Sequence, residues 1–253
     1  MAKAIRLTVF DVSGFFAIFR KHHTTTSTLS YSFPPRTTVL GLLAAILGYE
    51  RDSYYSIFSP ELCRVAVQVK SPVRHMTNTV NYLMTDGKTP NIKMLRGLKG
   101  RMPVHVDVLL SGQNAPSQLS YRIFFNHNNE DIQNELTKRL AQGKFAYPPY
   151  LGTANNLADI RYIGLAEAEV YKPEGEIEIS TVLRSSALVT LNYLGGTRIL
   201  IEELVPTSFD EDRRPGKTET YIYEAEGRAF KAMVNCEVFS CEVDGGRVVG
   251  VFL

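Results

Sequence analysis

Ser32-Phe33-Pro34-Pro35-Arg36-Thr37-Thr38-Val39-Leu40-Gly41-Leu42-Leu43-Ala44-Ala45-Ile46-Leu47-Gly48 has the pattern of a buried helix with a marked beginning and end. The apolar residues from Val39 to Leu47 recur at helical spacing, which predicts one face packed on a core. Two prolines hold the preceding chain extended, and Thr37 or Thr38 is the expected N-cap. Gly48 is the expected C-terminal stop.

Segments of alternating hydrophobicity lie on both sides of this helix. They predict strands over residues 2–10, 63–70, 104–110, 119–125 and 162–171, and a second amphipathic helix over 130–142. The order β-α-β-β-α-β is typical of the ferredoxin-like fold, which is also the framework of RNA-recognition domains. We therefore expect an α+β protein whose residues 1–174 form a ferredoxin-like palm domain.

The pattern changes near residues 172–175. Short strands are expected over 176–183, 187–191, 197–204, 220–224 and 237–243, and Asp244-Gly245-Gly246 is a hairpin turn signal before 248–252. Residues 175–253 are accordingly predicted to form a smaller β-rich C-terminal domain.

Charge is distributed unevenly along the chain, although the total is only +2. Eight cations and one acid, Asp86, lie between Arg64 and Val106, so this stretch carries +7 and the rest carries 2 − 7 = −5. Such asymmetry favours a polyanionic partner, while a solvated basic loop is the alternative. The strongest part, about residues 71–103, is predicted to be an inserted basic arm.

Composition excludes several classes of protein. The 253 residues are 44% hydrophobic and 21% charged, as in a globular core rather than a disordered chain. No apolar run is long enough for a membrane helix, no leader is expected, and the three cysteines form no CxxC pair. We expect a cytoplasmic protein with no metal site and no cofactor.

The segment 32–48 closely resembles the signature of the fifth CRISPR-associated protein family. A second match is Tyr150-Leu151-Gly152-Thr153-Ala154-Asn155-Asn156-Leu157-Ala158-Asp159-Ile160, and weaker support comes from Val80-Asn81-Tyr82 and Tyr121-Arg122-Ile123. The resemblance spans about the first two thirds of the chain. Its members are RAMP-superfamily subunits of type I Cascade complexes, and the arm looks most like that of subtype I-B.

The resemblance implies a non-catalytic RNA-binding subunit of a Cascade surveillance complex, acting in defence against foreign DNA. Such subunits hold the 5′ handle of the crRNA, contact the backbone subunit and the large subunit, and bring an arm called the thumb over the RNA near the target DNA. No membrane partner is implied.

Candidate RNA-binding residues follow from these two lines of reasoning. Thr37 and Thr38 would offer helix N-terminal amides to a phosphate beside the Arg36 fork, although capping alone explains the threonines. Gly152 and Thr153 would form a tight turn near a phosphate or a plain structural turn. The remaining candidates belong to the arm and its base: Arg74, His75, Asn78, Lys88, Lys93, Arg96, Lys99 and Arg101.

A metal-independent endoribonuclease that processes CRISPR repeat RNA is the alternative function. Lys21, His22, His23 and Tyr31 could then supply acid, base and charge stabilisation. One subtype of the family cleaves precursor RNA with a Tyr, Lys and His set, but no Lys-His pair occurs in the arm here. Adjacent histidines in a polar loop are more often exposed and inert.

Overall fold

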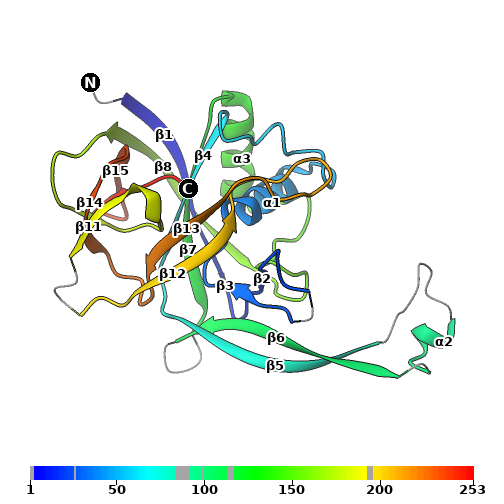
Figure 1. The fold of residues 1–253 in the computed structure, drawn as a ribbon. Helices are drawn as coiled ribbons and strands as arrows, with labels where there is room; N and C mark the ends of the chain where they lie inside the picture. Colours follow the sequence, from blue (N-terminus) through cyan, green and yellow to red (C-terminus); the bar gives the residue numbers. More distant parts are fainter. Residues whose placement is uncertain (1–2, 26, 84–91, 99, 113–116, 193–195) are drawn as a thin grey trace.

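A six-stranded antiparallel sheet forms the centre of the molecule. The computed structural model describes residues 3–25, 27–83, 92–98, 100–112, 117–192 and 196–253 (Figure 1). The strand order is β16-β15-β8-β1-β7-β4. These strands are β1 (Lys3–Gly14), β4 (Cys63–Val69), β7 (Leu119–His127), β8 (Asp159–Tyr171), β15 (Val238–Val243) and β16 (Gly246–Gly250). The strands predicted near 2–10, 63–70, 119–125 and 162–171 are confirmed.

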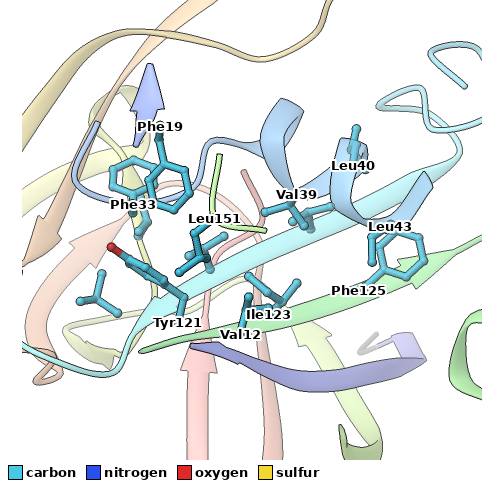
Figure 2. Packing of buried hydrophobic residues seen from close by; sticks show 14 of the residues in the cluster. Val12, Phe19, Phe33, Val39, Leu40, Leu43, Tyr121, Ile123, Phe125 and Leu151 are labelled. Atoms are coloured by element: carbon cyan, nitrogen blue, oxygen red, sulfur yellow. The ribbon is translucent and has the colours of Figure 1, made fainter. Parts of the chain in front are cut away.

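Two helices, α1 (Arg36–Leu47) and α3 (Glu130–Gln142), lie next to each other against the sheet (Figure 1). Val39 and Leu43 of α1 pack towards Ile123 and Phe125 of β7, and all four side chains are almost fully buried (Figure 2). Burial of such side chains is the main stabilising term for an amphipathic helix. The helical spacing of the apolar residues therefore correctly predicts which face of α1 is buried in the core.

The N-terminus of α1 differs from the prediction. Pro35, not a threonine, occupies the N-cap position with an extended backbone, and no side chain caps the helix. The proline already has the backbone geometry that an N-cap needs, so the helix begins at Arg36, two residues earlier than it would with Thr37 as the N-cap. The predicted stop is confirmed, because Gly48 is left-handed with φ 83° and donates to the carbonyls of Ala44 and Ala45.

The third predicted strand lies outside the main sheet. Residues 104–110 belong to β6 (Arg101–Ser111), which pairs along its whole length with β5 (Val73–Leu83). The register runs from Val73 opposite Ser111 to Leu83 opposite Arg101. This ribbon extends away from the rest of the molecule and carries α2 (Ile92–Leu95) at its far end (Figure 1). The arm therefore runs from residue 73 to 111, and we use the name for that range.

Backbone hydrogen bonds attach the arm to the loop that follows β1. Leu109 and Ala17 exchange two bonds of 2.9 and 3.1 Å, and the amide of Asp107 donates to the carbonyl of Thr28 at 2.8 Å. The loop itself contains the short pair β2 (Phe19–Arg20) and β3 (Ser30–Tyr31). On β5, the amide of Val73 donates to the carbonyl of Ala225 at 3.1 Å, so both strands of the ribbon are attached at its base.

The C-terminal strands share a sheet and a core with the N-terminal part. The elements after β8 and before β15 are β9 (Ile177–Ile179), β10 (Leu183–Arg184), the 3₁₀ helix η1 (Ser185–Ala187), β11 (Leu188–Asn192), β12 (Ile199–Pro206), β13 (Thr218–Glu224) and β14 (Phe230–Val234). They form the three-stranded sheets β10-β13-β12 and β11-β14-β9. After these two small sheets the chain returns to the main sheet, where β15 pairs with β8. The change of pattern at 172–175 therefore marks the end of β8 and not the edge of the main sheet. Among the described residues, no helix is long and apolar enough to cross a bilayer.

Candidate nucleic-acid interface

The arm is basic and exposed. Arg74 at its base and Lys93, Arg96 and Arg101 farther out are all exposed, and no acid occurs in the described stretches 73–83, 92–98 and 100–106. The structure therefore places four predicted RNA-binding cations on one projecting element. Lys88 and Lys99, which the sequence also predicts, lie outside the described residues.

Cross-strand register gives the ribbon two chemically different faces. Because opposite residues share a face, Met76 pairs with Val108, Val80 with Val104 and Tyr82 with Met102 on the apolar face; Arg74 and Asn78 also lie there. The other face carries polar residues: His75, Thr77, Thr79, Asn81, His105 and Asp107. Met76, Tyr82 and Met102 are exposed, so the apolar face offers surface for stacking or wedging against bases.

His75 lies at the base of the arm and connects it to the main body. Its Nδ1 is 2.7 Å from Oδ2 of Asp107 on β6, and its Nε2 is 2.8 Å from Oγ of Ser32. The Ser32 hydroxyl donates to Oε1 of Glu202 on β12 at 2.6 Å. The Lys21 ammonium is 2.7 Å from the other carboxylate oxygen of Glu202. Both ring nitrogens of His75 are thus engaged within the protein.

Sequence reasoning identified His75 and Lys21 but not Ser32, Asp107 or Glu202. One signal was available: Asp107 is the only acid between residues 87 and 129, and it interrupts a run of valines. No such signal marks Glu202, which is 170 residues from Ser32 in the sequence.

The alternative catalytic residues do come together, but the tyrosine is buried. His22 Nδ1 is 3.3 Å from the Tyr31 hydroxyl, and Lys21 Nζ is 5.1 Å from the centre of the Tyr31 ring. Tyr31 is 1% exposed and donates its hydroxyl to the carbonyl of Leu204 at 2.6 Å. Burial, followed by the charge of Glu202, raises the pKa of Tyr31.

The two histidines of this loop face solvent. His22 and His23 are exposed, and their rings meet edge to face. Partial burial, and after it the neighbouring His23, lowers the pKa of His22. A neutral His22 is a competent base, but the tyrosine beside it cannot reach a phosphodiester without an opening of the loop.

Arg36 is not the solvated phosphate fork that the sequence predicts. It is 3% exposed, and its guanidinium donates to the carbonyls of Phe58, Cys63 and Thr207 and to the thiol of Cys63. The segment between α1 and β4 folds over the N-terminus of α1 and covers the side chain. Arg36 therefore joins three segments of the core region, and its donors are turned away from solvent.

Thr37 and Thr38 line a groove together with Gly152. The groove, of about 910 Å³, is also lined by residues of α1 and by Tyr54, Tyr147 and Tyr150. The structure thus brings together two predicted sites that are far apart in the sequence. Their shared groove is aromatic, which suits unstacked bases better than an isolated phosphate.

Gly152 also has a structural role that the sequence left open. Its φ is +86°, and a Cβ placed there would collide with the carbonyl of Ile18. Ile18 in turn donates its amide to the carbonyl of Leu151 at 3.1 Å. Thr153 accepts a hydrogen bond from the Asn156 side chain at 3.0 Å, which closes the turn. The turn is therefore fixed against the loop after β1.

Comparison with known proteins gives a consistent family. The profile of the family described as CRISPR-associated protein (Cas_Cas5) matches residues 8–175. No curated protein matches the chain. Among solved structures, a CRISPR protein from Archaeoglobus fulgidus is 16% identical, with 97% of this chain and 99% of that chain covered and a TM-score of 0.57.

A chain described as a CRISPR RNA-guided surveillance complex is 13% identical, with 90% of this chain and 91% of that chain covered and a TM-score of 0.49. The first of these two likenesses extends the shared fold to nearly the whole chain. The family profile alone spans about two thirds of the sequence, including both motifs that carried the resemblance. The protein therefore belongs to the Cas5 family of CRISPR-associated proteins.

Proposed function

We propose that this chain is a non-catalytic RNA-binding subunit of a type I CRISPR Cascade complex, and that it holds the 5′ handle of the crRNA. The observation that carries the proposal is the projecting arm, whose described residues include four exposed cations and, apart from Asp107, no acid. Cations that can approach an extended polyanion from a projecting ribbon are the usual basis of sequence-independent phosphate binding.

The ferredoxin-like interpretation agrees with the strand order of the main sheet. The strands β8, β1, β7 and β4 are adjacent in that order, and α1 and α3 connect β1 to β4 and β7 to β8. Contacts with the backbone subunit, the large subunit and the target DNA belong to the same proposal. The exposed apolar face of the arm and the aromatic groove beside α1 are the surfaces available for them.

The absence of a catalytic step is also part of the proposal. Two observations support it: the Tyr31 hydroxyl is engaged with the Leu204 carbonyl, and the Lys21 ammonium is paired with Glu202. A nuclease that cleaves at a 2′-hydroxyl needs such groups free to touch the substrate.

The test is the salt dependence of RNA binding. Arg74, Lys93, Arg96 and Arg101 are replaced together by Ala, and binding to a single-stranded CRISPR repeat RNA is measured over a series of salt concentrations. The log–log slope should flatten by roughly 0.7 for each RNA phosphate that the variant no longer neutralises.

A matched control keeps the change in net charge constant. Lys138, Lys144, Lys172 and Lys231 are exposed lysines outside the arm, and replacing them by Ala also lowers the net charge by four. This control should keep the wild-type slope. If the arm variant and the control flatten the slope equally, the effect is general charge and the arm is not the binding site.

A further inference from the structure

The hydrogen bonds of His75 connect the base of the arm to the main body. Nδ1 of the ring is 2.7 Å from Oδ2 of Asp107 on the neighbouring strand of the ribbon. Nε2 is 2.8 Å from Oγ of Ser32, whose hydroxyl donates to Oε1 of Glu202 at 2.6 Å. Carboxylate oxygens are acceptors, so Asp107 and Glu202 stand at the two ends of this network.

The two ends of this network are more buried than the ring that joins them. Asp107 on β6 and Glu202 on β12 have side chains that are 11% and 7% exposed, whereas the His75 side chain is 40% exposed. Lys21 pairs with the other carboxylate oxygen of Glu202. His75 therefore spans two largely buried acceptor groups from the surface of the molecule.

The network joins the arm to parts of the chain that are distant in sequence. Farther along β5, Thr79 bonds within the ribbon, to His105 at 3.1 Å. His75 instead bonds to Ser32, which lies between β3 and α1, and through it to β12. The ring is thus a polar side-chain link from β5 to the main body, next to the apolar contact of Val73 with the core.

We propose that His75, whose ring lies between Asp107 and Ser32, is a positioning residue that fixes the direction in which the arm leaves the main sheet. Backbone bonds hold β6 to Ala17 and Thr28, and the amide of Val73, the first residue of β5, donates to the carbonyl of Ala225. The His75 bridge adds a contact farther along β5, and this contact restrains rotation of the ribbon about its base. Only the effect on RNA binding rests on the proposed function; the restraint itself does not.

Pulsed electron resonance measures the restraint without RNA. Spin labels are placed on Lys93→Cys in α2 and Lys138→Cys in α3, in a chain that also carries Cys236→Ser because Cys63 and Cys241 are buried. His75→Ala and Ser32→Ala should each broaden the distribution of distances between the two labels. His105→Ala is the matched control, since it removes a histidine whose side chain bonds to Thr79 within the arm and leaves its backbone bond to Thr28 in place, and it should keep the parent distribution.

Two results would overturn the proposal. One is an unchanged distribution in both His75→Ala and Ser32→Ala, with the fold verified by circular dichroism. The other is equal broadening in His105→Ala, because any loss of an arm histidine would then suffice.

RNA binding separates this inference from the proposed function. His75→Ala should lower repeat-RNA affinity by about tenfold, equivalent to about 1.4 kcal/mol, and should retain more of the salt slope than the arm variant lacking four cations. If His75→Ala broadens the distances but RNA binding does not depend on the four arm cations, the proposed function is wrong and the positioning role stands. If the distances are unchanged but binding does depend on those cations, the positioning role is wrong and the proposed function stands.

Discussion

The guanidinium of Arg36 donates to both the carbonyl oxygen and the thiol sulfur of Cys63, at 3.4 and 3.1 Å. Cys63 begins β4 and Arg36 begins α1, so this pair joins the first turn of the helix to the edge strand of the main sheet. The same side chain also reaches the carbonyls of Phe58 and Thr207. A planar cation with several donors can satisfy all these acceptors at once, which an ammonium cannot.

Arg36 is therefore expected to stabilise the fold. Arg36→Ala should lower the free energy of unfolding by about 2–4 kcal/mol, because it leaves buried carbonyl groups without donors. Arg36→Lys should recover only part of the loss. Urea unfolding measures both, with Arg51→Ala as the control at a side chain that is 77% exposed. Wild-type stability in Arg36→Ala would show that the buried bonds contribute nothing net.

Gly152 is expected to tolerate no side chain. Gly152→Ala must adopt a positive φ and also push against the Ile18 carbonyl, so its cost should exceed the roughly 1 kcal/mol of a left-handed alanine. Gly143→Ala is the matched control, because φ there is +63° and a Cβ would meet nothing within 4 Å. Thermal unfolding of the two variants compares them directly. Equal losses would mean that the turn yields and the contact with Ile18 is unimportant.

Asp244 should make folding stability depend on acid pH. Its carboxylate is 2.6 Å from Arg122, and the hydrogen bond and charge of Arg122 lower the pKa of Asp244 from 3.8. A lowered folded pKa adds stability above the unfolded value, and this stability is lost as the pH falls through the folded pKa. Asp244→Asn keeps a residue suited to the positive φ of 53°. Its stability deficit should be present at neutral pH and vanish in acid below pH 3.8.

The control for this pH dependence is Asp212→Asn. Asp212 is also paired with an arginine, but its side chain is 69% exposed and the separation is 3.4 Å. Such surface pairs contribute little, so this variant should follow the wild-type profile. A deficit in Asp244→Asn that persists unchanged below pH 3.8 would assign the effect to the turn rather than to charge.

The chain should not cut RNA. Incubation of the purified protein with repeat RNA, in EDTA or in magnesium, is expected to leave the RNA intact on a denaturing gel. Tyr31→Phe should lower the melting temperature, since it removes the bond to the Leu204 carbonyl. Cleavage at one position that is abolished in His22→Ala, but kept in His105→Ala, would instead establish the endoribonuclease alternative.

Local patterns along the chain determined a large part of this structure. The helical spacing from Val39 to Leu47, the left-handed stop at Gly48 and the hairpin turn at Asp244 and Gly245 each depend on a few neighbouring residues. Such features can be predicted because hydrophobic periodicity and backbone sterics act over one or two turns of chain. The basic character of the arm is likewise a property of the sequence alone.

Pairing and burial were decided by tertiary structure. The alternation of residues 104–110 predicts a strand, and they do form one. The alternation does not specify the partner, which is β5 and not the main sheet. The sequence around Arg36 does not distinguish a buried arginine from a surface one. Its guanidinium becomes a buried donor because Phe58, Cys63 and Thr207, which are distant in the sequence, place their carbonyls around it. The network from Asp107 through His75 and Ser32 to Glu202 needs four segments of the chain to meet. No local rule specifies such contacts, because their energy arises only when distant segments exclude water together.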